Sequence, residues 1–491
     1  MQRLTRNLLF RLNPNIVIFI NVKFYVIFMK VLLIQPNYRR IYAYAKKKEI
    51  TPVFPPLGLA YITAVLRDNN FQVKILEANA NDFNHEQIKE KIEEYSPDIV
   101  GLTSTTSLIE EAHEIAKLCP ENIKVIIGGI HASSIPQETL EKFERFDYLV
   151  RGEGEFTMLE FMQKKPISKI KGLSYKKEGK IIHNPPRELN NELDALPFPA
   201  RDLLDMEKYF SAGAKQTPSD YILSSRGCPY QCIFCADHLV HGKKFRFRSP
   251  ENIIKEVEEL YERGVKDFDF VDDNFTLIMK RVERFCDLMI EKGLNKKMSW
   301  RCANGIRVDR ITPELLKKMK NAGCYMVSLG IESGNEEVLR KMKKSINLEK
   351  VRTAVKWCKE AGIETRGLFM FGNLGENRQT MEDTINFAKS LDLDTATFHI
   401  TIPFPNTDYW KIVKAEGEIY PKNYRDYIAY GNVIFQHGKL SEELLMEMQK
   451  KAYRSFYFRP KIFFKALKNL NSPKKLKVYF NAGIAFLGVG K

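Results

Sequence analysis

The chain has 491 residues, 44% of them hydrophobic and 28% charged, as expected for a globular protein of two or three domains. Its eight cysteines show no disulfide framework, which excludes a secreted disulfide scaffold and favours a reducing cytoplasm. The net charge of +16 comes from the ends alone, because residues 1–48 hold ten Lys or Arg, residues 448–491 hold eleven, and neither stretch has an Asp or Glu, a distribution that disfavours nucleic acid as a partner.

Residues 1–28 combine three arginines with most of the apolar run NIVIFINVKFYVIFM (15–29). This arrangement is similar to a signal peptide, but no small-residue cleavage site follows, and Lys23 interrupts a run that is short for a membrane span. Met29 then opens MKVLLIQPN, a typical first strand of a domain. An unused upstream start, a membrane anchor and a true extension all stay open, and we favour the first.

Between residues 29 and 165, five short apolar strands alternate with helices, a pattern that predicts a parallel, doubly wound sheet of flavodoxin type. The predicted strands are Val31–Gln35, Val73–Glu77, Ile99–Thr103, Val125–Gly128 and Tyr148–Arg151. Ligands of such sheets lie at the carboxyl ends of the strands. The candidate ligand residues at those ends are Pro36, Asn37, Thr103, Ser104, Thr105, Gly128, Gly129, His131 and Glu153.

Residues 166–218 read as a linker, with a hairpin around Glu178-Gly179 and a proline-stiffened stretch at 193–205. Residues 219–415 contain six further strand–helix repeats, which predict a partial (βα)6 barrel with its site at the carboxyl ends of the strands. The predicted strands are Tyr221–Ser225, Asp267–Val271, Ser299–Ala303, Tyr325–Gly330, Arg366–Phe371 and Thr395–Ile402. Residues 416–491 are predicted to form a small, basic and mostly helical C-terminal region.

The loop after the first barrel strand carries Cys228, Cys232 and Cys235 with the spacing C-x-x-x-C-x-x-C. A cubane iron–sulfur cluster normally takes four thiolates, so three thiolates would leave one iron of such a cluster open to a substrate. Structural zinc also takes four ligands, usually in two separated pairs. Because no second pair is present, the spacing disfavours zinc.

This cysteine loop resembles the cluster loop of radical S-adenosylmethionine (radical SAM) enzymes, and DDNFT (272–276), GIESG (330–334) and PFPNT (403–407) follow in the order of that superfamily. The resemblance covers about residues 31–460. It implies that Cys228, Cys232 and Cys235 are catalytic and hold a [4Fe–4S] cluster whose open iron binds SAM. The other residues that it implies in SAM binding are Phe234, Asp272, Asp273, Asn274, Ser328, Glu332 and Gly372.

Residues 29–165 resemble the cobalamin-binding domain that precedes many radical SAM cores, through PPLGLAYITAVL (55–66), Gly128-Gly129 and RGEGE (151–155). The D-x-H-x-x-G motif, which supplies a histidine lower ligand to cobalt in methionine-synthase-type domains, is absent. The resemblance therefore implies cobalamin bound without a histidine lower ligand, at the candidate residues from Pro36 to Glu153 given above. A vestigial or purely structural domain is the alternative.

The segment FYFRPKIFFKALKNL (456–470) predicts a basic amphipathic helix. Such a helix either lies on a membrane surface or docks on the rest of the protein, and we favour docking slightly. A peripheral position at the membrane therefore stays open, and so does a lipid substrate beside a soluble small molecule.

The resemblance implies an enzyme that cleaves SAM to a 5′-deoxyadenosyl radical and, with cobalamin, methylates an unactivated carbon. The protein positions the cofactors, which carry the difficult chemistry. An electron donor such as ferredoxin or flavodoxin is an implied partner. The alternatives are radical C–C bond formation or cyclisation, with or without cobalamin, and a non-catalytic corrinoid-binding sensor or carrier.

Overall fold

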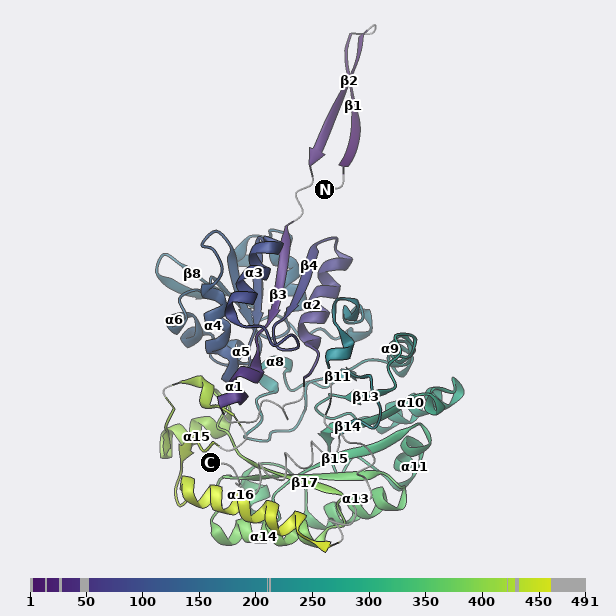
Figure 1. Cartoon of the computed structure of the whole chain (residues 1–491), viewed down its shortest axis with the longest axis vertical. Coiled ribbons are helices and arrows are strands. Elements are labelled where there is room, and N and C mark those ends of the chain that lie inside the picture. The colour runs from purple at the N-terminus through teal and green to yellow at the C-terminus, as the bar shows by residue number, and fades with distance from the viewer. Residues whose placement is uncertain are drawn as a thin grey trace.

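The computed structural model describes residues 3–13, 16–25, 29–44, 53–209, 211, 213–421, 423–428 and 432–460. Two α/β units account for most of them, the first drawn above the second in Figure 1. The predicted extension contains an antiparallel hairpin of β1 (Arg3–Asn13) and β2 (Ile16–Tyr25). Across these described ranges, no helix is both long and apolar enough to span a membrane. Most of the predicted basic helix, from residue 461 on, lies outside them.

The first unit is built on a seven-stranded sheet of order β4-β3-β5-β6-β7-β8-β9. Its first five strands are parallel and follow the 2-1-3-4-5 order of a flavodoxin-type sheet, which confirms the predicted fold class. The strands are β3 (Lys30–Gln35), β4 (Gln72–Glu77), β5 (Ile99–Thr103), β6 (Lys124–Gly128), β7 (Tyr148–Val150), β8 (Leu173–Lys177) and β9 (Lys180–His183). The predicted linker hairpin is the pair β8–β9, which extends this sheet antiparallel to β7.

Helices cover both faces of the first sheet, as the near-continuous apolar runs of its strands require. They are α1 (Tyr38–Tyr44), α2 (Leu57–Asp68), α3 (His85–Tyr95), α4 (Ile109–Lys117), α5 (Ile130–Ser134), α6 (Pro136–Lys142) and α7 (Glu155–Met162). Short 3₁₀ turns are η2 (Thr106–Leu108), η3 (Ile167–Lys169), η4 (Leu193–Ala195), η5 (Arg201–Leu203) and η6 (Met206–Lys208). Asn84 begins α3 with a capping box to Gln87.

The second unit is a six-stranded parallel sheet whose strand order follows the chain, β10-β13-β14-β15-β16-β17, as predicted for a partial barrel. Its strands are β10 (Ser219–Ile222), β13 (Asp267–Phe270), β14 (Ser299–Ile306), β15 (Cys324–Glu332), β16 (Glu364–Phe371) and β17 (Thr395–Ile400). The helices are α9 (Pro250–Glu262), α10 (Met279–Glu291), α11 (Pro313–Asn321), α12 (Glu336–Lys341), α13 (Leu348–Glu360) and α14 (Arg378–Ser390), with η7 (Leu294–Lys296) before β14.

Helix ends in the second unit carry the residues that favour helix starts and stops. The Ser249 side chain caps α9, with Pro250 at its first position. Gly264, Gly323 and Gly362 follow helices at positive φ, where glycine is tolerated best.

A C-terminal helix, α16 (Glu442–Tyr457), covers the edge strand β17. The Tyr453 hydroxyl accepts the Phe398 N–H, and the Tyr457 hydroxyl exchanges hydrogen bonds with the N–H and carbonyl of Ala396. These side chains occupy backbone groups that an uncovered edge would leave open to another strand. The remaining elements are β11 (Ser225–Arg226), β12 (Arg246–Phe247), α8 (His238–His241), α15 (Asp408–Glu416), β18 (Glu418–Ile419), η8 (Tyr424–Asp426) and β19 (Phe435–Gln436).

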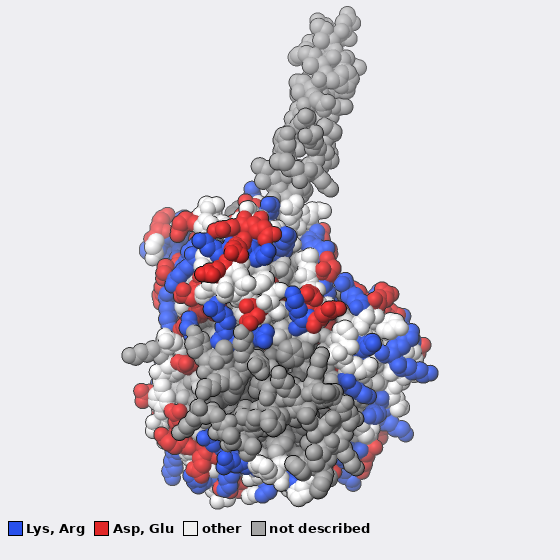
Figure 2. Space-filling view, in the orientation of Figure 1, with Lys and Arg blue, Asp and Glu red and all other residues white. Residues whose placement is uncertain are grey.

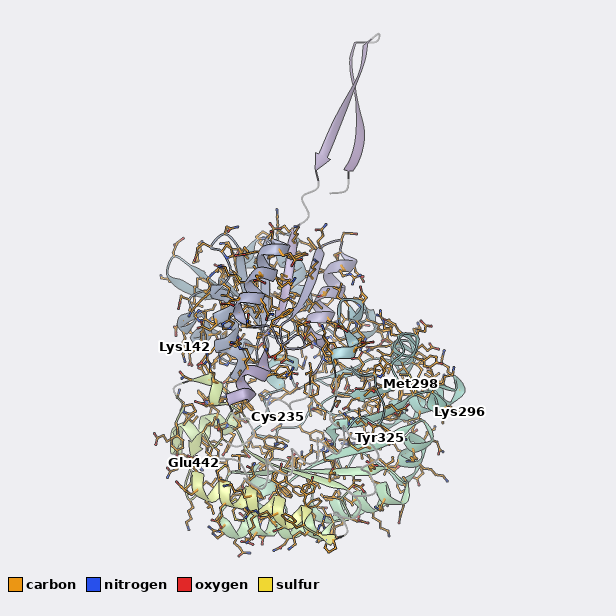
Figure 3. The ribbon with its side chains drawn as sticks, in the orientation of Figure 1. Lys142, Cys235, Lys296, Met298, Tyr325 and Glu442 are labelled. Atoms are coloured by element: carbon orange, nitrogen blue, oxygen red, sulfur yellow. The ribbon has the colours of Figure 1, made fainter. Side chains whose placement is uncertain are left out.

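The carboxyl edge of the first sheet faces the second unit, as the course of β3 into α1 shows in Figure 1. Cys235 lies between the two units (Figure 3). On the face drawn in Figure 2, acidic and basic side chains alternate over the first unit, which suits the near-neutral middle of the sequence. Both predicted ligand edges therefore meet around the cysteine loop.

Candidate functional site

The three cysteines lie on a loop with a closed neck. β11 and β12 pair antiparallel on either side of it, with Arg226 opposite Arg246. Gly227 has φ +80°, and a Cβ there would lie 2.5 Å from the Lys244 carbonyl oxygen, so only glycine lets the loop begin in this way.

Backbone hydrogen bonds then fix the middle of the cysteine loop to the barrel. The Ile233 N–H donates to the Met342 carbonyl at 3.2 Å, and the Ile233 carbonyl accepts the Tyr409 N–H at 2.9 Å. The Cys232 Sγ lies 3.9 Å from the Lys343 carbonyl oxygen. Because both neighbours follow barrel strands, the loop lies over the carboxyl ends of the barrel.

The thiols of this loop fit an iron–sulfur cluster better than a single metal ion. All three are free and half-buried, and burial raises the pKa of each, to about 12 for Cys235. A buried thiolate needs a cation to offset its desolvation. Among the residues that the structure describes, no three His, Cys, Asp or Glu side chains lie close enough together to hold one metal ion. Three free thiols on one loop, each buried enough to need a cation when ionised, fit the donor set of the cluster.

Asp272, predicted to contact SAM, accepts hydrogen bonds at the base of the cysteine loop. One oxygen accepts the Ser224 N–H at 2.7 Å, and the other accepts the hydroxyls of Ser224 and Ser225 at 2.6 and 2.5 Å. Arg281 lies 3.5 Å away on the same side. With both oxygens occupied, this carboxylate favours a structural role over the predicted contact.

The next two residues of the DDNFT motif, Asp273 and Asn274, carry polar groups that could bind a ligand. Burial and the negative charge of Asp237 raise the pKa of Asp273 to about 8, so these carboxyls share a proton near neutral pH. Asn274 is fully buried, and neither its Oδ1 nor its Nδ2 has a hydrogen-bond partner. Buried polar atoms are rarely left without a hydrogen-bond partner, so the Asn274 amide is a candidate for binding a ligand.

Glu332 ends β15 at φ +67°, an unusual conformation for a residue with a side chain. Its carboxylate accepts a hydrogen bond from Lys344 at 2.6 Å. The charges that affect the Cys232 thiol include Glu332 itself, Lys344 and Arg307, so Glu332 lies close to the cysteine loop.

The other predicted SAM residues occupy different levels of the same site. Ser328 is fully buried four residues earlier on β15, with its Oγ 3.9 Å from the Met326 sulfur. Gly372 takes φ +92° and donates its N–H to Glu376 at 2.7 Å. Phe234 is half-buried and packs against the main core.

At the facing edge of the first unit, predicted cobalamin residues converge. Gly129 has φ +97°, and a Cβ there would lie 2.5 Å from the Ser104 carbonyl oxygen. The Ser104 hydroxyl and both ring nitrogens of His131 are buried without hydrogen-bond partners. Burial lowers the pKa of His131 to about 3, so this ring is neutral, and it packs edge-on against Tyr424 at 4.5 Å. A glycine pair beside unpaired polar atoms fits the amide-rich edge of a corrinoid.

The remaining predicted cobalamin residues differ in burial and in the hydrogen bonds that they make within the protein. Asn37 is fully buried and closes its own loop, donating to Asp82 at 3.0 Å and accepting the Arg39 N–H at 3.1 Å. Pro36 and Gly128 lie beside the sites described, Thr103 is half-buried, and Thr105 is exposed next to Ser107.

Glu153 holds the neck of the cysteine loop. Its carboxylate lies 2.7 and 3.0 Å from Arg246, 3.2 Å from His241 and 3.5 Å from Arg226. Arg226 also pairs with Glu155 at 2.6 Å. Because cations of the second unit occupy both oxygens, this geometry favours a bracing role for Glu153 over the predicted cobalamin contact.

Sequence reasoning missed Arg226, Arg246, Asp237 and Lys344. Arg226 stands next to the cysteine motif, in SSRGC, and that position is a usable signal. The others carry no local pattern, since their roles depend on partners brought close by folding.

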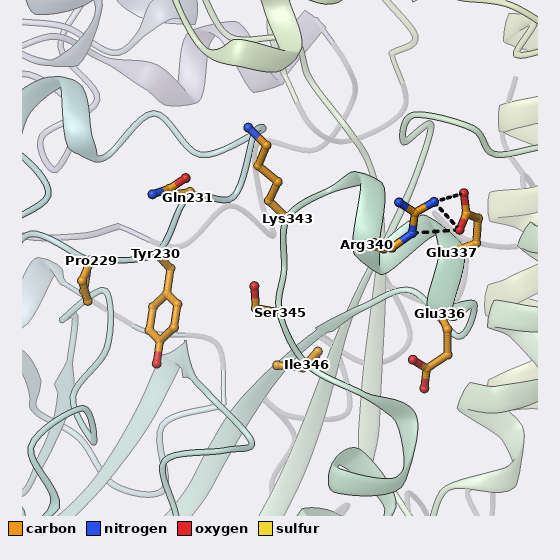
Figure 4. A pocket seen from close by; sticks show the side chains of 9 residues that line it. All are labelled: Pro229, Tyr230, Gln231, Glu336, Glu337, Arg340, Lys343, Ser345 and Ile346. Carbon is orange, nitrogen blue, oxygen red and sulfur yellow. Dashed lines mark hydrogen bonds and ion pairs between the residues drawn. The ribbon is translucent and has the colours of Figure 1, made fainter.

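A cavity of about 870 Å³ lies against the outer face of the cysteine loop (Figure 4). Residues that follow the first cysteine form one wall, and α12 with the segment after it forms the other. The lining residues are Pro229, Tyr230, Gln231, Glu336, Glu337, Arg340, Lys343, Ser345 and Ile346. Arg340 is paired with Glu337 at 2.7 Å, whereas Lys343 extends freely in the view.

Comparisons with known proteins agree with this arrangement. The model of the radical SAM superfamily matches residues 222–388, and that of the B12 binding domain matches residues 48–162. An uncharacterised methyltransferase of Pyrococcus horikoshii is 37% identical, over 89% of this chain and 94% of that protein. The anaerobic magnesium-protoporphyrin IX monomethyl ester cyclase of Cereibacter sphaeroides is 26% identical, over 94% and 77%.

A solved structure supports the fold. The radical SAM methyltransferase TsrM of Kitasatospora setae, solved with tryptophan and a SAM analogue, superposes with a TM-score of 0.68 at 20% identity. The match covers 88% of this chain and 90% of that one. Both units and their order are therefore shared.

Proposed function

Because this chain belongs to the radical SAM superfamily, in the group that also carries a B12-binding domain, we propose that it methylates an unactivated carbon of a small molecule. It is an enzyme whose cofactors are a [4Fe–4S] cluster, SAM and cobalamin. When bound, these groups supply a hydrogen-abstracting carbon radical and a transferable methyl group. The observation that carries the proposal is the meeting of the cysteine loop with the carboxyl edge of the first sheet.

The chain's own residues bind and orient the reacting groups. We assign the iron to Cys228, Cys232 and Cys235. The shared-proton carboxyls of Asp273 and Asp237 suit a cationic amine, since a carboxylate–ammonium hydrogen bond is charge-assisted. Asn274 has its amide NH2 group as donor and its carbonyl oxygen as acceptor to offer SAM, and Glu332 is the candidate for the ribose hydroxyls of SAM.

On the opposite side we assign cobalamin to Ser104, Gly128, Gly129 and His131. His131 is neutral and packed under Tyr424, so it suits the lining of the site better than a ligand to cobalt. The cover that Tyr424 provides excludes water from this part of the edge, as radical chemistry requires.

An electron donor such as ferredoxin or flavodoxin is part of this proposal. The cavity beside the cysteine loop is the candidate place for such a donor, because the Lys343 carbonyl in its lining lies against Cys232. Arg340 and Lys343 in the same lining are balanced by Glu336 and Glu337.

Ring closure is the second candidate, because the Cereibacter relative is named a cyclase. The test uses anaerobic protein reconstituted with iron, sulfide and hydroxocobalamin, supplied with methyl-labelled SAM and a reductant. We expect a four-iron electron paramagnetic resonance signal, labelled cobalamin and 5′-deoxyadenosine from the wild type. Cys232→Ala should lose the signal and the cleavage, whereas Cys358→Ala, a buried thiol away from the loop, should keep both.

Each alternative has its own outcome in this experiment. 5′-Deoxyadenosine without label on cobalamin would favour cyclisation or coupling. Bound cobalamin without any SAM cleavage would favour a corrinoid sensor or carrier.

A further inference from the structure

The inner wall of the barrel is open along β16 and β17. Their outward side chains are buried, as Phe398 is against Tyr453 and Phe456 of α16. Side chains alternate across a strand, so the half-buried set between them faces the lumen. That set is Arg366, Leu368 and Met370 on β16, with Thr395, Thr397 and His399 on β17.

One line of ionisable groups, Glu332, His399 and Arg366, runs down this lumen. Burial lowers the pKa of His399, the positive charge of Arg366 lowers it further, and the negative charge of Glu332 opposes both. His399 therefore lies within electrostatic range of the proposed ribose residue above and of Arg366 below. Arg366 is level with Ser328, four residues before Glu332 on β15, roughly 13 Å along the strand.

Two guanidinium groups lie near each other at the floor of the barrel. The backbone N–H groups of Lys215 and Gln216 donate to Asp267, the first residue of β13, so this segment crosses the amino-terminal end. The position that a Cβ on Gly213 would occupy is 3.2 Å from the Arg301 Nη1 and 3.6 Å from the Arg366 Nη2. Glycine at this point leaves both groups room to approach.

The two arginines are unevenly satisfied. Arg301 is almost fully buried and pairs with Asp269 at 3.0 Å and with Ser211, yet its Nη1 has no hydrogen-bond partner. Arg366 makes no hydrogen bond or ion pair within the described part of the chain. A charge facing a partly dehydrated lumen is costly without a partner, and a buried donor is rarely left unpaired.

We propose that Arg366, with Arg301 behind it, binds an anionic group of the substrate, either a carboxylate or a phosphoryl group. The planar fork of a guanidinium matches two oxygens of either anion. The inference rests on the proposed function, because it takes the lumen below the SAM site as the place of the reacting molecule. Because Arg366 is level with a residue four positions before Glu332, the anion would lie at the opposite end of the lumen from the proposed ribose site.

The test is anion binding by the full-length, reconstituted protein. Butylphosphonate and pentanoate carry the two anions on chains of equal length, and pentanamide is their neutral counterpart. Isothermal titration calorimetry should show that the wild type binds one anion at least tenfold more tightly than the amide. The preferred anion identifies the group as phosphoryl or carboxylate.

Variants locate the site. Arg366→Gln should weaken binding of the preferred anion at least tenfold, and Arg366→Lys, which keeps the charge but loses the fork, should weaken it less. Arg284→Gln is the matched control, since Arg284 is an exposed residue of α10 paired with Glu251 and Glu291. The cluster signal reports folding in each variant. If Arg366→Gln shows no cluster signal, the Arg366→Lys variant is used to decide. Weaker anion binding by Arg366→Lys than by the wild type supports the anion site, and equal binding contradicts it.

The inference is overturned if Arg366→Gln binds the anion as the wild type does, or if the wild type prefers neither anion to the amide. Failure of the proposed function is a separate result, because it shows as absent SAM cleavage by the wild type. If the wild type cleaves SAM normally and anion binding is the same with or without Arg366, the anion site is wrong and the proposed function still stands.

Discussion

Replacing Glu153 by Gln tests whether the first unit holds the cysteine loop closed. The carboxylate joins Arg226 and Arg246, which stand opposite each other at the neck, and also contacts His241. Glutamine keeps the shape of the side chain but removes its charge. Two buried arginines then lose their shared counterion, although Arg226 keeps Glu155.

The magnitude follows from the pKa of Glu153. Burial alone would raise it, but hydrogen bonds from His241 and Arg246 and the nearby charges outweigh burial and lower it from 4.5 to about 2. That difference corresponds to about 3 kcal/mol, at the lower end of the roughly 3–5 kcal/mol that breaking a buried ion pair costs. Because the folded-state pKa is depressed, this stabilisation is complete above pH 4.5 and disappears as the pH falls towards 2.

Urea unfolding at pH 7, together with iron content after reconstitution, provides the assay. We expect Glu153→Gln to lose about 3 kcal/mol of unfolding free energy and to retain less iron per chain. Glu178→Gln, in the exposed β8–β9 turn, is the control. Arg246→Gln should cost a similar amount, and the double variant should cost less than the sum of the two. An unfolding midpoint and iron content equal to those of Glu178→Gln would refute the bracing role.

Two further predictions concern a buried acid and the tail. Burial raises the pKa of Glu376 from 4.5 to about 7, despite hydrogen bonds from Gly372 and Asn373. Ionisation of Glu376 therefore lowers the free energy of unfolding as the pH rises from 4.5 to 7, and above pH 7 the loss is about 3 kcal/mol. Glu376→Gln should therefore gain on the wild type in urea midpoint between pH 5 and pH 8, and parallel midpoints would contradict this. Removing residues 461–491 should abolish flotation with anionic vesicles if the basic tail contacts membranes, and undiminished flotation would end that hypothesis.

The sequence predicted the elements that depend on local pattern. The parallel strands were readable because each is either a short apolar run, such as Val125–Ile127 within β6, or an alternation of apolar and polar residues, such as Asp267–Phe270 in β13. The cysteine loop was readable because its ligands lie within eight residues of chain. The comparisons confirm the family that this loop indicated.

Roles that depend on distant partners were not readable. Asp272 looked like a ligand residue, but folding brings Ser224 to it from 48 residues away. Glu153 looked like part of a ligand edge, but its arginine partner lies 93 residues further on. A carboxylate at a strand end has the same sequence signature whether it meets a ligand or an arginine, so only packing distinguishes the two.

These long-range contacts change how the two units relate. A loop that holds an iron–sulfur cluster must keep its thiols at a fixed spacing. Backbone hydrogen bonds at the middle of the loop would not by themselves keep its neck closed, where Arg226 stands opposite Arg246. Glu153 holds both sides of that neck, and its neighbour Glu155 holds one side again. The same RGEGE segment follows β7 of the sheet whose edge is assigned to cobalamin. The first unit is thus a structural part of the cluster site, and the ion pairs of Glu153 and Glu155 with Arg226 give movement at the cobalamin edge a short route to the cysteines.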